Sequence, residues 1–220
     1  MTLTEARNTL GCKFPSHEVS FPDGGFKIDT YQTPTTFQQL MTSSSFPPHY
    51  RLSQPGHERI DLQMIGMPGK EVVHGIAHRK MYDTASRPPK DALDAALLKK
   101  YGAPSNTSDL YAFGKRHTWF FDVSGNLISN SQYQRMGCMS PIPAKSGVTS
   151  GFAKEGCGVV LDAFFRPARD NPQLVEELNV IVVDPHGLAS GITAVQQHFD
   201  SIENARRNAE TNQASSDIDL

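Results

Sequence analysis

Three residues in one short segment have the chemistry to bind a divalent metal ion. In MPGKEVVHGIAHR, residues 67–79, Glu71 precedes His74 by three positions and His78 follows His74 by four. If this segment is a helix, that spacing places all three side chains on one face. Carboxylate and imidazole groups are zinc ligands, and a further ligand from elsewhere would complete a metal site. The spacing is not HExxH. A solvated polar face opposite the apolar positions is the favoured alternative.

A second group could belong to a hydrolase. In VVDPHGLASG, Asp184, His186 and Ser190 follow an apolar run, where a catalytic loop could lie. The G-x-S-x-G pattern of a nucleophile elbow is absent, and so are the glycine spacings of phosphate-binding loops. We therefore interpret this segment as a turn into the last helix, with Ser190 as its cap.

Charge and hydropathy exclude several classes of partner. The 220 residues include 21 basic and 23 acidic side chains, giving a formal net charge of -2. This balance does not favour nucleic acid or an anionic membrane surface as the main partner. The longest apolar runs, such as residues 180–183, are too short to span a bilayer. MTLTEARNTLG at the start lacks the basic and apolar regions of a signal peptide.

Two of the three cysteines predict a disulfide. Cys138 and Cys157 flank a loop that is rich in Gly, Ser and Pro. Closing such a loop would stabilise the fold by about 3 kcal/mol in the chain-entropy model. The alternative is two unrelated buried thiols in a reducing cytosol. A disulfide would place the protein in the envelope or outside the cell.

The elements that must position these residues follow from periodicity and turn signals. We expect helices at 2–10, 70–79, 90–101 and 188–206, and strands at 17–21, 26–31, 59–66, within 110–129, at 158–166 and at 179–184. Residues 171–178 are expected to be a linker or a helical turn, and 207–220 a disordered tail. The last helix has a stripe of apolar residues at steps of four and three.

These elements predict an α+β fold, an antiparallel sheet with helices packed on one face. MTLTEARNTL at 1–10 aligns without gaps to MPGKEVVHGI at 67–76. Each copy is expected to form a short helix followed by hairpin strands, which suggests two tandem related modules. The expected organisation is a first helix-plus-hairpin module with a linker (1–57), a second α+β module ending in an amphipathic helix (58–206), and the tail.

The second copy also carries a family resemblance. Gly66, Met67, Glu71, Val72 and Ile76, followed by LLKKYGAPS at 97–105, are similar to bacterial envelope modules. The pattern resembles the SmpA/OmlA small outer-membrane lipoproteins and the tandem β-lactamase inhibitory protein. The resemblance covers residues 1–30 and 59–135. It implies helix-plus-antiparallel-sheet modules that bind other proteins.

An aromatic segment is the candidate for such a contact. In LYAFGKRHTWFF, Tyr111, Phe113, Trp119 and Phe121 would share one face of a continuous strand. An exposed aromatic face could bind a partner, whereas a buried one would form the core under the helices. The helix at 188–206 could dock on its own sheet or on a second copy, giving a homo-oligomer.

These observations favour a non-catalytic bacterial envelope protein, periplasmic or secreted, that binds another protein. We assign no catalytic residue, cofactor or metal in this interpretation. The alternative is a metal-binding protein or metal-dependent enzyme that uses Glu71, His74 and His78.

Overall fold

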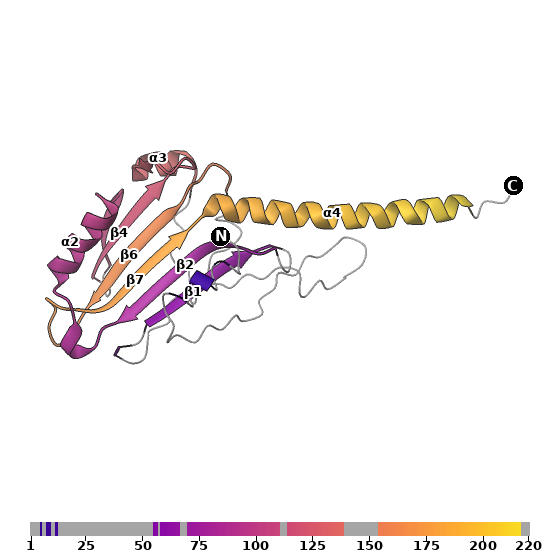
Figure 1. Ribbon diagram of the computed structural model, residues 1–220. Coiled ribbons are helices and arrows are strands. Elements are labelled where there is room, and N and C mark those ends of the chain that lie inside the picture. The colour runs from indigo at the N-terminus through magenta and orange to yellow at the C-terminus, as the bar shows by residue number, and fades with distance from the viewer. Residues whose placement is uncertain are drawn as a thin grey trace.

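The computed structural model describes residues 55–56, 58–66, 70–110, 114–138 and 154–216, with positions 5, 8, 9 and 12. Figure 1 shows the described elements in one continuous arrangement around a twisted sheet. In chain order they are β1 (Glu58–Ile65), β2 (Val72–Met81), the short 3-10 turn η1 (Thr84–Ser86), α2 (Lys90–Tyr101), β3 (Asn106–Leu110), β4 (Gly114–Phe121), β5 (Leu127–Ile128), α3 (Asn130–Arg135), β6 (Val160–Pro167), β7 (Val175–Val183) and α4 (Pro185–Ser216).

The strands form a single antiparallel sheet in the order β1-β2-β7-β6-β4-β3, with β5 paired to β4. The late strands β6 and β7 therefore lie between β2 and β4. Figure 1 shows α2 packed along one side of the sheet and α4 extending well beyond it. The predicted α+β class with an antiparallel sheet is confirmed.

The two faces of the sheet differ in burial. Along β7 the exposure alternates, so that odd-numbered positions are buried and even-numbered positions are half-buried. We call the side that carries Trp119, Leu161, Val180 and Val182 the α2 face, because Leu97 of α2 packs against it. The other side, which carries Phe120, Val160 and Ile181, is the opposite face.

The main core lies beneath α2. Leu97 of this helix packs with Trp119, Leu161 and Phe165, and the Trp119 ring is completely buried. The indole Nε1 donates a hydrogen bond to the carbonyl of Gly102 at 3.0 Å, which satisfies its polar group. Gly102 has φ of 80° and ends α2 where the sequence predicts.

A smaller core on the opposite face contains the predicted disulfide. Phe120 stacks on Tyr133 of α3 with ring centroids 4.2 Å apart. Cys138 and Cys157 are bonded, with Cα atoms 5.7 Å apart, and both are buried in this cluster with Val160. The predicted Cys138–Cys157 pairing is confirmed.

The helix predicted at 70–79 is wrong, because most of this segment is strand β2. Antiparallel pairing with β1 on one side and β7 on the other satisfies its backbone groups. Its β-branched residues fit a strand, and a Cβ on Gly75 would lie 2.6 Å from Gln63 Oε1. In the first copy of the proposed repeat, the described positions Glu5 and Asn8 are helical. The two copies therefore differ in structure at the positions that are described in both.

Two other boundaries differ from the predictions. β7 begins at Val175, inside the segment expected to be a linker, because its alternating side chains pair with β2 and β6. α4 continues to Ser216, ten residues past the predicted end, so the expected disordered tail is helical over 207–216. The strands expected at 17–21 and 26–31 lie outside the described residues. No described helix is long and apolar enough to cross a membrane.

Candidate binding surface on the sheet

The structure separates the residues of the predicted metal site. In a strand, His74 and His78 share one side, whereas Glu71 lies before β2 at a position of opposite parity. His78 Nε2 lies 2.5 Å from Glu58 Oε1 on β1, and His74 is buried. Within the part of the chain that the structure describes, no group of three or more His, Cys, Asp or Glu residues could hold a metal ion. The geometric basis of the metal alternative is therefore wrong.

His74 is an enclosed neutral imidazole. Its side chain is buried, with only 5% of the residue exposed, and its Nδ1 has no hydrogen-bond partner among the described residues. Burial lowers the pKa of His74 from 6.5 to about 4, because desolvation disfavours the charged ring more strongly than the Asp184 carboxylate favours it. The side chain therefore contributes to packing near neutral pH.

The segment considered for a hydrolase is the start of α4. Asp184 Oδ1 accepts a hydrogen bond from the Gly187 amide at 2.9 Å, and the Asp184 amide donates to the His74 carbonyl at 2.7 Å. Asp184 therefore caps the helix, and the prediction that Ser190 does so is wrong. His186 and Ser190 are both exposed on the helix.

The aromatic candidates are only partly on the described chain. Trp119 is 0% exposed, so its ring belongs to the core rather than to a contact surface. Phe121 is half-buried against the same core. Tyr111 and Phe113 lie outside the described residues.

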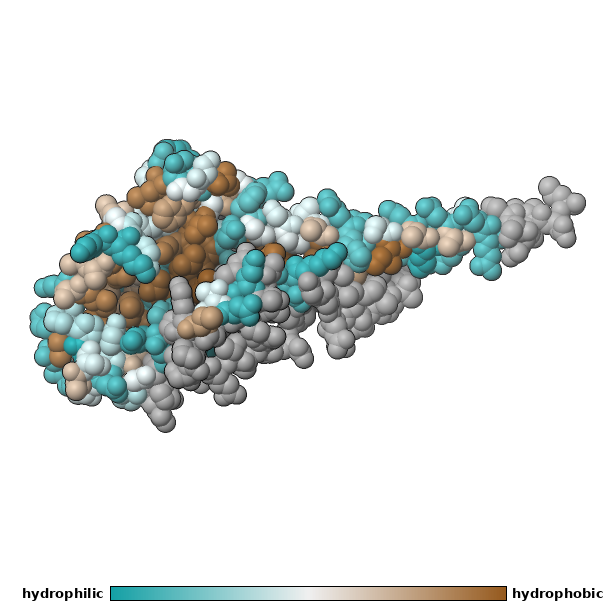
Figure 2. Space-filling view, in the orientation of Figure 1, coloured by the Kyte–Doolittle hydropathy of each residue, from teal (hydrophilic) through white to brown (hydrophobic). Residues whose placement is uncertain are grey.

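An apolar surface remains accessible on the α2 face, beside the core under α2. We call it the open floor. It comprises five half-buried residues from three adjacent strands: Ile60, Leu62, Ile76, Val180 and Val182. The registers place Leu62, Ile76 and Val182 in one row, and Ile60, the half-buried His78 and Val180 in the next. Figure 2 shows hydrophobic side chains gathered between α2 and the first turns of α4.

Charged groups limit the open floor at the end away from α4. The next row places Glu58 opposite Lys80. Lys80 Nζ lies 3.9 Å from Glu58 Oε2, and its side chain is 41% exposed. The surface is thus entirely apolar only in the row nearest α4. The next row contains His78, and the row after it contains Glu58 and Lys80 beside Leu178. Sequence reasoning missed the open floor because it assigned β2 to a helix.

A polar network fastens α2 to the sheet. His117 Nε2 lies 2.5 Å from Asp94 Oδ1, and His117 Nδ1 lies 2.9 Å from Thr107 Oγ1 on β3. Carboxylate, imidazole and hydroxyl follow each other as in a hydrolase triad. However, His117 is only 2% exposed, and Lys115 Nζ donates to Asp94 Oδ2 at 2.8 Å. Burial alone would raise the pKa of Asp94, but the hydrogen bonds from Lys115 and His117 outweigh it and lower the pKa.

Replacing His117 by Ala should loosen α2 from the sheet. The change removes the imidazole that joins Asp94 to Thr107 and leaves a cavity beside Trp119, whose ring centroid lies 5.8 Å from that of His117. We expect the free energy of unfolding to fall by about 2–3 kcal/mol, as measured by urea denaturation. The exposed His198→Ala variant is the control. Equal stability of the two variants would show that the network does not hold α2.

The opposite face carries a second polar group, which the sequence did not reveal because GVVLDAFFR reads as an apolar strand. Arg116 Nε and Thr118 Oγ1 both donate to Asp162 Oδ1 at 2.8 Å. Burial raises the pKa of Asp162, although Arg116 and Thr118 oppose this effect. Arg166 Nη2 lies 2.8 Å from Glu177 Oε2. These groups are buried or nearly so, unlike the open floor.

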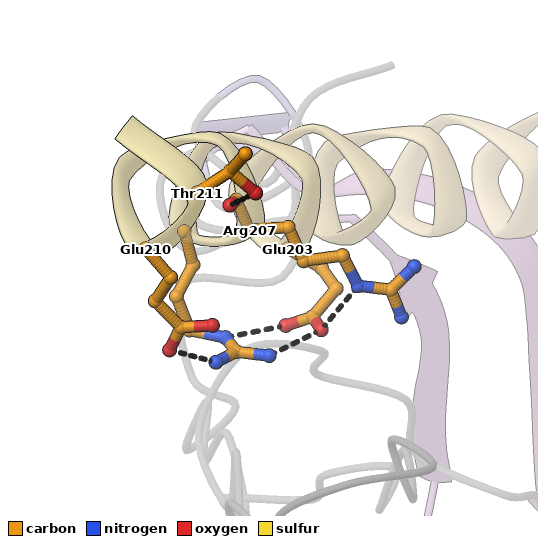
Figure 3. Close-up of polar contacts among 5 residues, drawn as sticks. Glu203, Arg207, Glu210 and Thr211 are labelled. Carbon is orange, nitrogen blue, oxygen red and sulfur yellow. Dashed lines mark hydrogen bonds and ion pairs between the residues drawn. The ribbon is translucent and has the colours of Figure 1, made fainter. Parts of the chain in front are cut away.

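The outer part of α4 is held by ion pairs within the helix. Glu203 accepts hydrogen bonds from Arg206 at 2.7 and 3.0 Å and from Arg207 at 3.0 Å, and Arg206 also pairs with Glu210 (Figure 3). The hydrogen bonds from Arg206 and Arg207 lower the pKa of Glu203 to about 2, although desolvation opposes this. Such pairs stabilise a helix whose side chains are exposed over residues 207–214.

Comparison with protein-family models, with curated proteins and with solved structures finds no match to this chain.

Proposed function

We propose that this protein is a non-catalytic module of the bacterial envelope that binds another protein through the open floor. The observation that carries this proposal is the group of half-buried aliphatic residues on the α2 face, of which Leu62, Ile76 and Val182 form one row. Contiguous apolar surface of this kind, limited by charged groups, is typical of interaction sites.

The charged residues at the end of the open floor support a specific contact rather than non-specific hydrophobic association. Lys80 is exposed enough to reach a partner while Glu58 holds His78 beside it. An apolar centre with polar groups at its border is the usual anatomy of a protein interface.

The disulfide supports an oxidising compartment. Cys138 and Cys157 are bonded in a buried cluster, and such bonds persist mainly in the periplasm and outside the cell. Together with the resemblance to envelope modules, this supports a periplasmic or secreted location for the protein.

Cross-linking in the host tests the proposal. We expect the wild-type protein to form a cross-linked adduct with a distinct partner, and Ile60→Lys to reduce its yield about ten-fold, because the ammonium would be desolvated in the contact. Met136→Lys is the matched control, since Met136 is also exposed but follows α3, which packs on the opposite face. Equal loss of the adduct in both variants, or no adduct with the wild type, would contradict the proposal.

A homo-oligomer formed through α4 is a second candidate. The apolar stripe of this helix continues to Ile202, which is 45% exposed. On the same stripe the following position is Arg206, which is engaged with Glu203. If α4 pairs with a second copy, sedimentation should give a dimer that Ile202→Lys converts to a monomer. A wild-type monomer at micromolar concentration would exclude it.

A further inference from the structure

We propose that Thr107 is a site of covalent acylation, at which its hydroxyl attacks an uncharged acyl ester while His117 accepts the hydroxyl proton. The proposal goes beyond protein binding, because Thr107 and His117 lie on β3 and β4, at the other end of the sheet from β1 and β2. It follows from the geometry of Asp94, His117 and Thr107, from the exposure of Thr107, and from the charges around it.

The hydrogen bonds fix which imidazole nitrogen acts on Thr107. His117 Nε2 lies 2.5 Å from Asp94 Oδ1, and His117 Nδ1 lies 2.9 Å from Thr107 Oγ1. Burial would raise the pKa of Asp94, but the hydrogen bonds from Lys115 and His117 lower it, so Asp94 is a carboxylate near neutral pH. A carboxylate only accepts hydrogen bonds. In the neutral imidazole the proton therefore lies on Nε2, and the lone pair of Nδ1 accepts the hydrogen bond from the hydroxyl.

Thr107 is accessible from solvent, whereas the imidazole behind it is enclosed. β3 is the last strand of the described sheet, and Thr107 is exposed on it. His117 is only 2% exposed and lies beside Trp119. An ester can therefore reach the hydroxyl, but an acylated Thr107 would keep water away from Nδ1. Because deacylation requires a water molecule at the base, we expect a stable ester of Thr107 rather than repeated turnover.

Lys115 supports the reaction without competing for the acyl group. The register pairs Thr107 with His117 and Asp109 with Lys115, so Lys115 is a diagonal neighbour of Thr107 and a long side chain there is within its reach. The hydrogen bond that Lys115 Nζ donates to Asp94 raises the pKa of Lys115. The side chain therefore stays an ammonium, which is a poor nucleophile but can stabilise the negative oxygen of a tetrahedral intermediate.

The surrounding carboxylates select the charge of the acyl group. Asp91, Asp94 and Asp109 all act electrostatically on Lys115. Three carboxylates around one ammonium leave an excess of negative charge beside Thr107, which repels an anionic acyl donor. An ester with an uncharged acyl group, such as acetyl, therefore fits this site best.

The acyl transfer balances without a further reactant. Thr107 Oγ1 forms a bond to the carbonyl carbon of the ester as its proton moves to His117 Nδ1. The tetrahedral intermediate then breaks the bond between that carbon and the oxygen of the leaving alcohol. This oxygen leaves with the electron pair and takes the proton from Nδ1. The products are a Thr107 ester, a free alcohol and a neutral His117, and no group is oxidised or reduced.

Reaction of the full chain with p-nitrophenyl acetate tests the proposal. We expect an acetyl group on Thr107, located by peptide mass spectrometry and released by neutral hydroxylamine, which cleaves esters but not amides. Thr107→Val should abolish this product and Thr107→Ser should retain it. Thr193→Val, an exposed change on α4, is the matched control and should leave it unaltered. His117→Gln should slow the acetylation of Thr107 about 100-fold, because it removes the general base.

The positioning role of Asp94 has its own pair of variants. Asp94→Asn should slow the acetylation about 100-fold, because an amide that donates to Nε2 turns the ring proton toward Thr107. Asp94→Glu keeps a carboxylate and should recover part of the rate. Urea denaturation of both variants measures their stability separately. Equal rates in the two variants would overturn the role of Asp94 in orienting the imidazole.

Two results would overturn the acylation site. One is acetylation of Lys115 or other lysines, as amides that resist hydroxylamine, with none on Thr107. The other is acetylation of Thr107 at the same rate in His117→Gln as in the wild type, which would show that the imidazole does not activate the hydroxyl. Neither result bears on the cross-linking experiment at the open floor, so the two proposals succeed or fail separately.

Discussion

Replacing Cys138 and Cys157 together by Ser should lower the free energy of unfolding by about 3 kcal/mol. The disulfide joins residues 19 positions apart, so in the unfolded chain it removes the entropy of a loop of that length. Both cysteines are also buried against Phe120 and Val160, and a serine hydroxyl there would lack the apolar contacts of sulfur. This is one of the two largest effects on stability that we expect.

Urea denaturation of the wild type, with and without reductant, measures this contribution. Reduction should shift the wild type toward the Cys138→Ser/Cys157→Ser variant and leave that variant unchanged. Cys12→Ser is the control, because Cys12 is the free, exposed cysteine. If reduction leaves the wild-type midpoint unchanged, the disulfide does not stabilise the fold, and the argument for an oxidising compartment weakens with it.

Acidification should destabilise the protein through His74. In the unfolded chain the imidazole has a pKa near 6.5, and in the folded chain burial lowers the pKa to about 4. Between these values the unfolded chain binds the proton and the folded chain does not. The free energy of unfolding should therefore fall as the pH decreases from 6.5 to about 4, by about 3 kcal/mol in total, and the contribution of His74 should level off below that.

The His74→Gln variant isolates this effect from that of other groups. The difference in unfolding free energy between wild type and variant should depend on pH between 4 and 6.5 and be constant above pH 7. His186→Gln is the matched control, because His186 is exposed on α4. A difference that does not change across this pH range would show that His74 is accessible to protons in the folded state.

Local patterns predict some elements of this fold well. α2 has Asp91 in its first turn, Lys99 and Lys100 in its last, and Gly102 at its end, and the structure has the helix at those bounds. β1 and β6 also follow from alternation and from apolar runs. In these segments the local signal and the tertiary pairing agree.

The prediction for β2 was wrong because one of its two pairing partners lies far away in the chain. β2 carries Val72, Val73 and Ile76, a short apolar set that fits a helix or a strand. Its pairing with β1 on one side and with β7, about a hundred residues later, on the other decides between them. The open floor combines residues from β1, β2 and β7, so its existence depends on that long-range pairing and not on a sequence motif.

The prediction for the outer part of α4 was wrong for a different reason. Residues 207–216 are polar, which is typical of a disordered tail. Yet Glu203, Arg206, Arg207 and Glu210 lie three or four positions apart and pair along the helix. The spacing of the charged residues, rather than their hydropathy, predicts a helix over residues 207–216.

The most direct test of the binding surface is a comparison of two photo-reactive substitutions in the living host. One replaces Ile60 on the open floor, and the other replaces Met136, which is 40% exposed after α3. We predict a discrete protein adduct at position 60 and at least ten-fold less of it at position 136. Equal adducts at the two positions, or an adduct at position 136 alone, would contradict the assignment of the open floor as the binding surface.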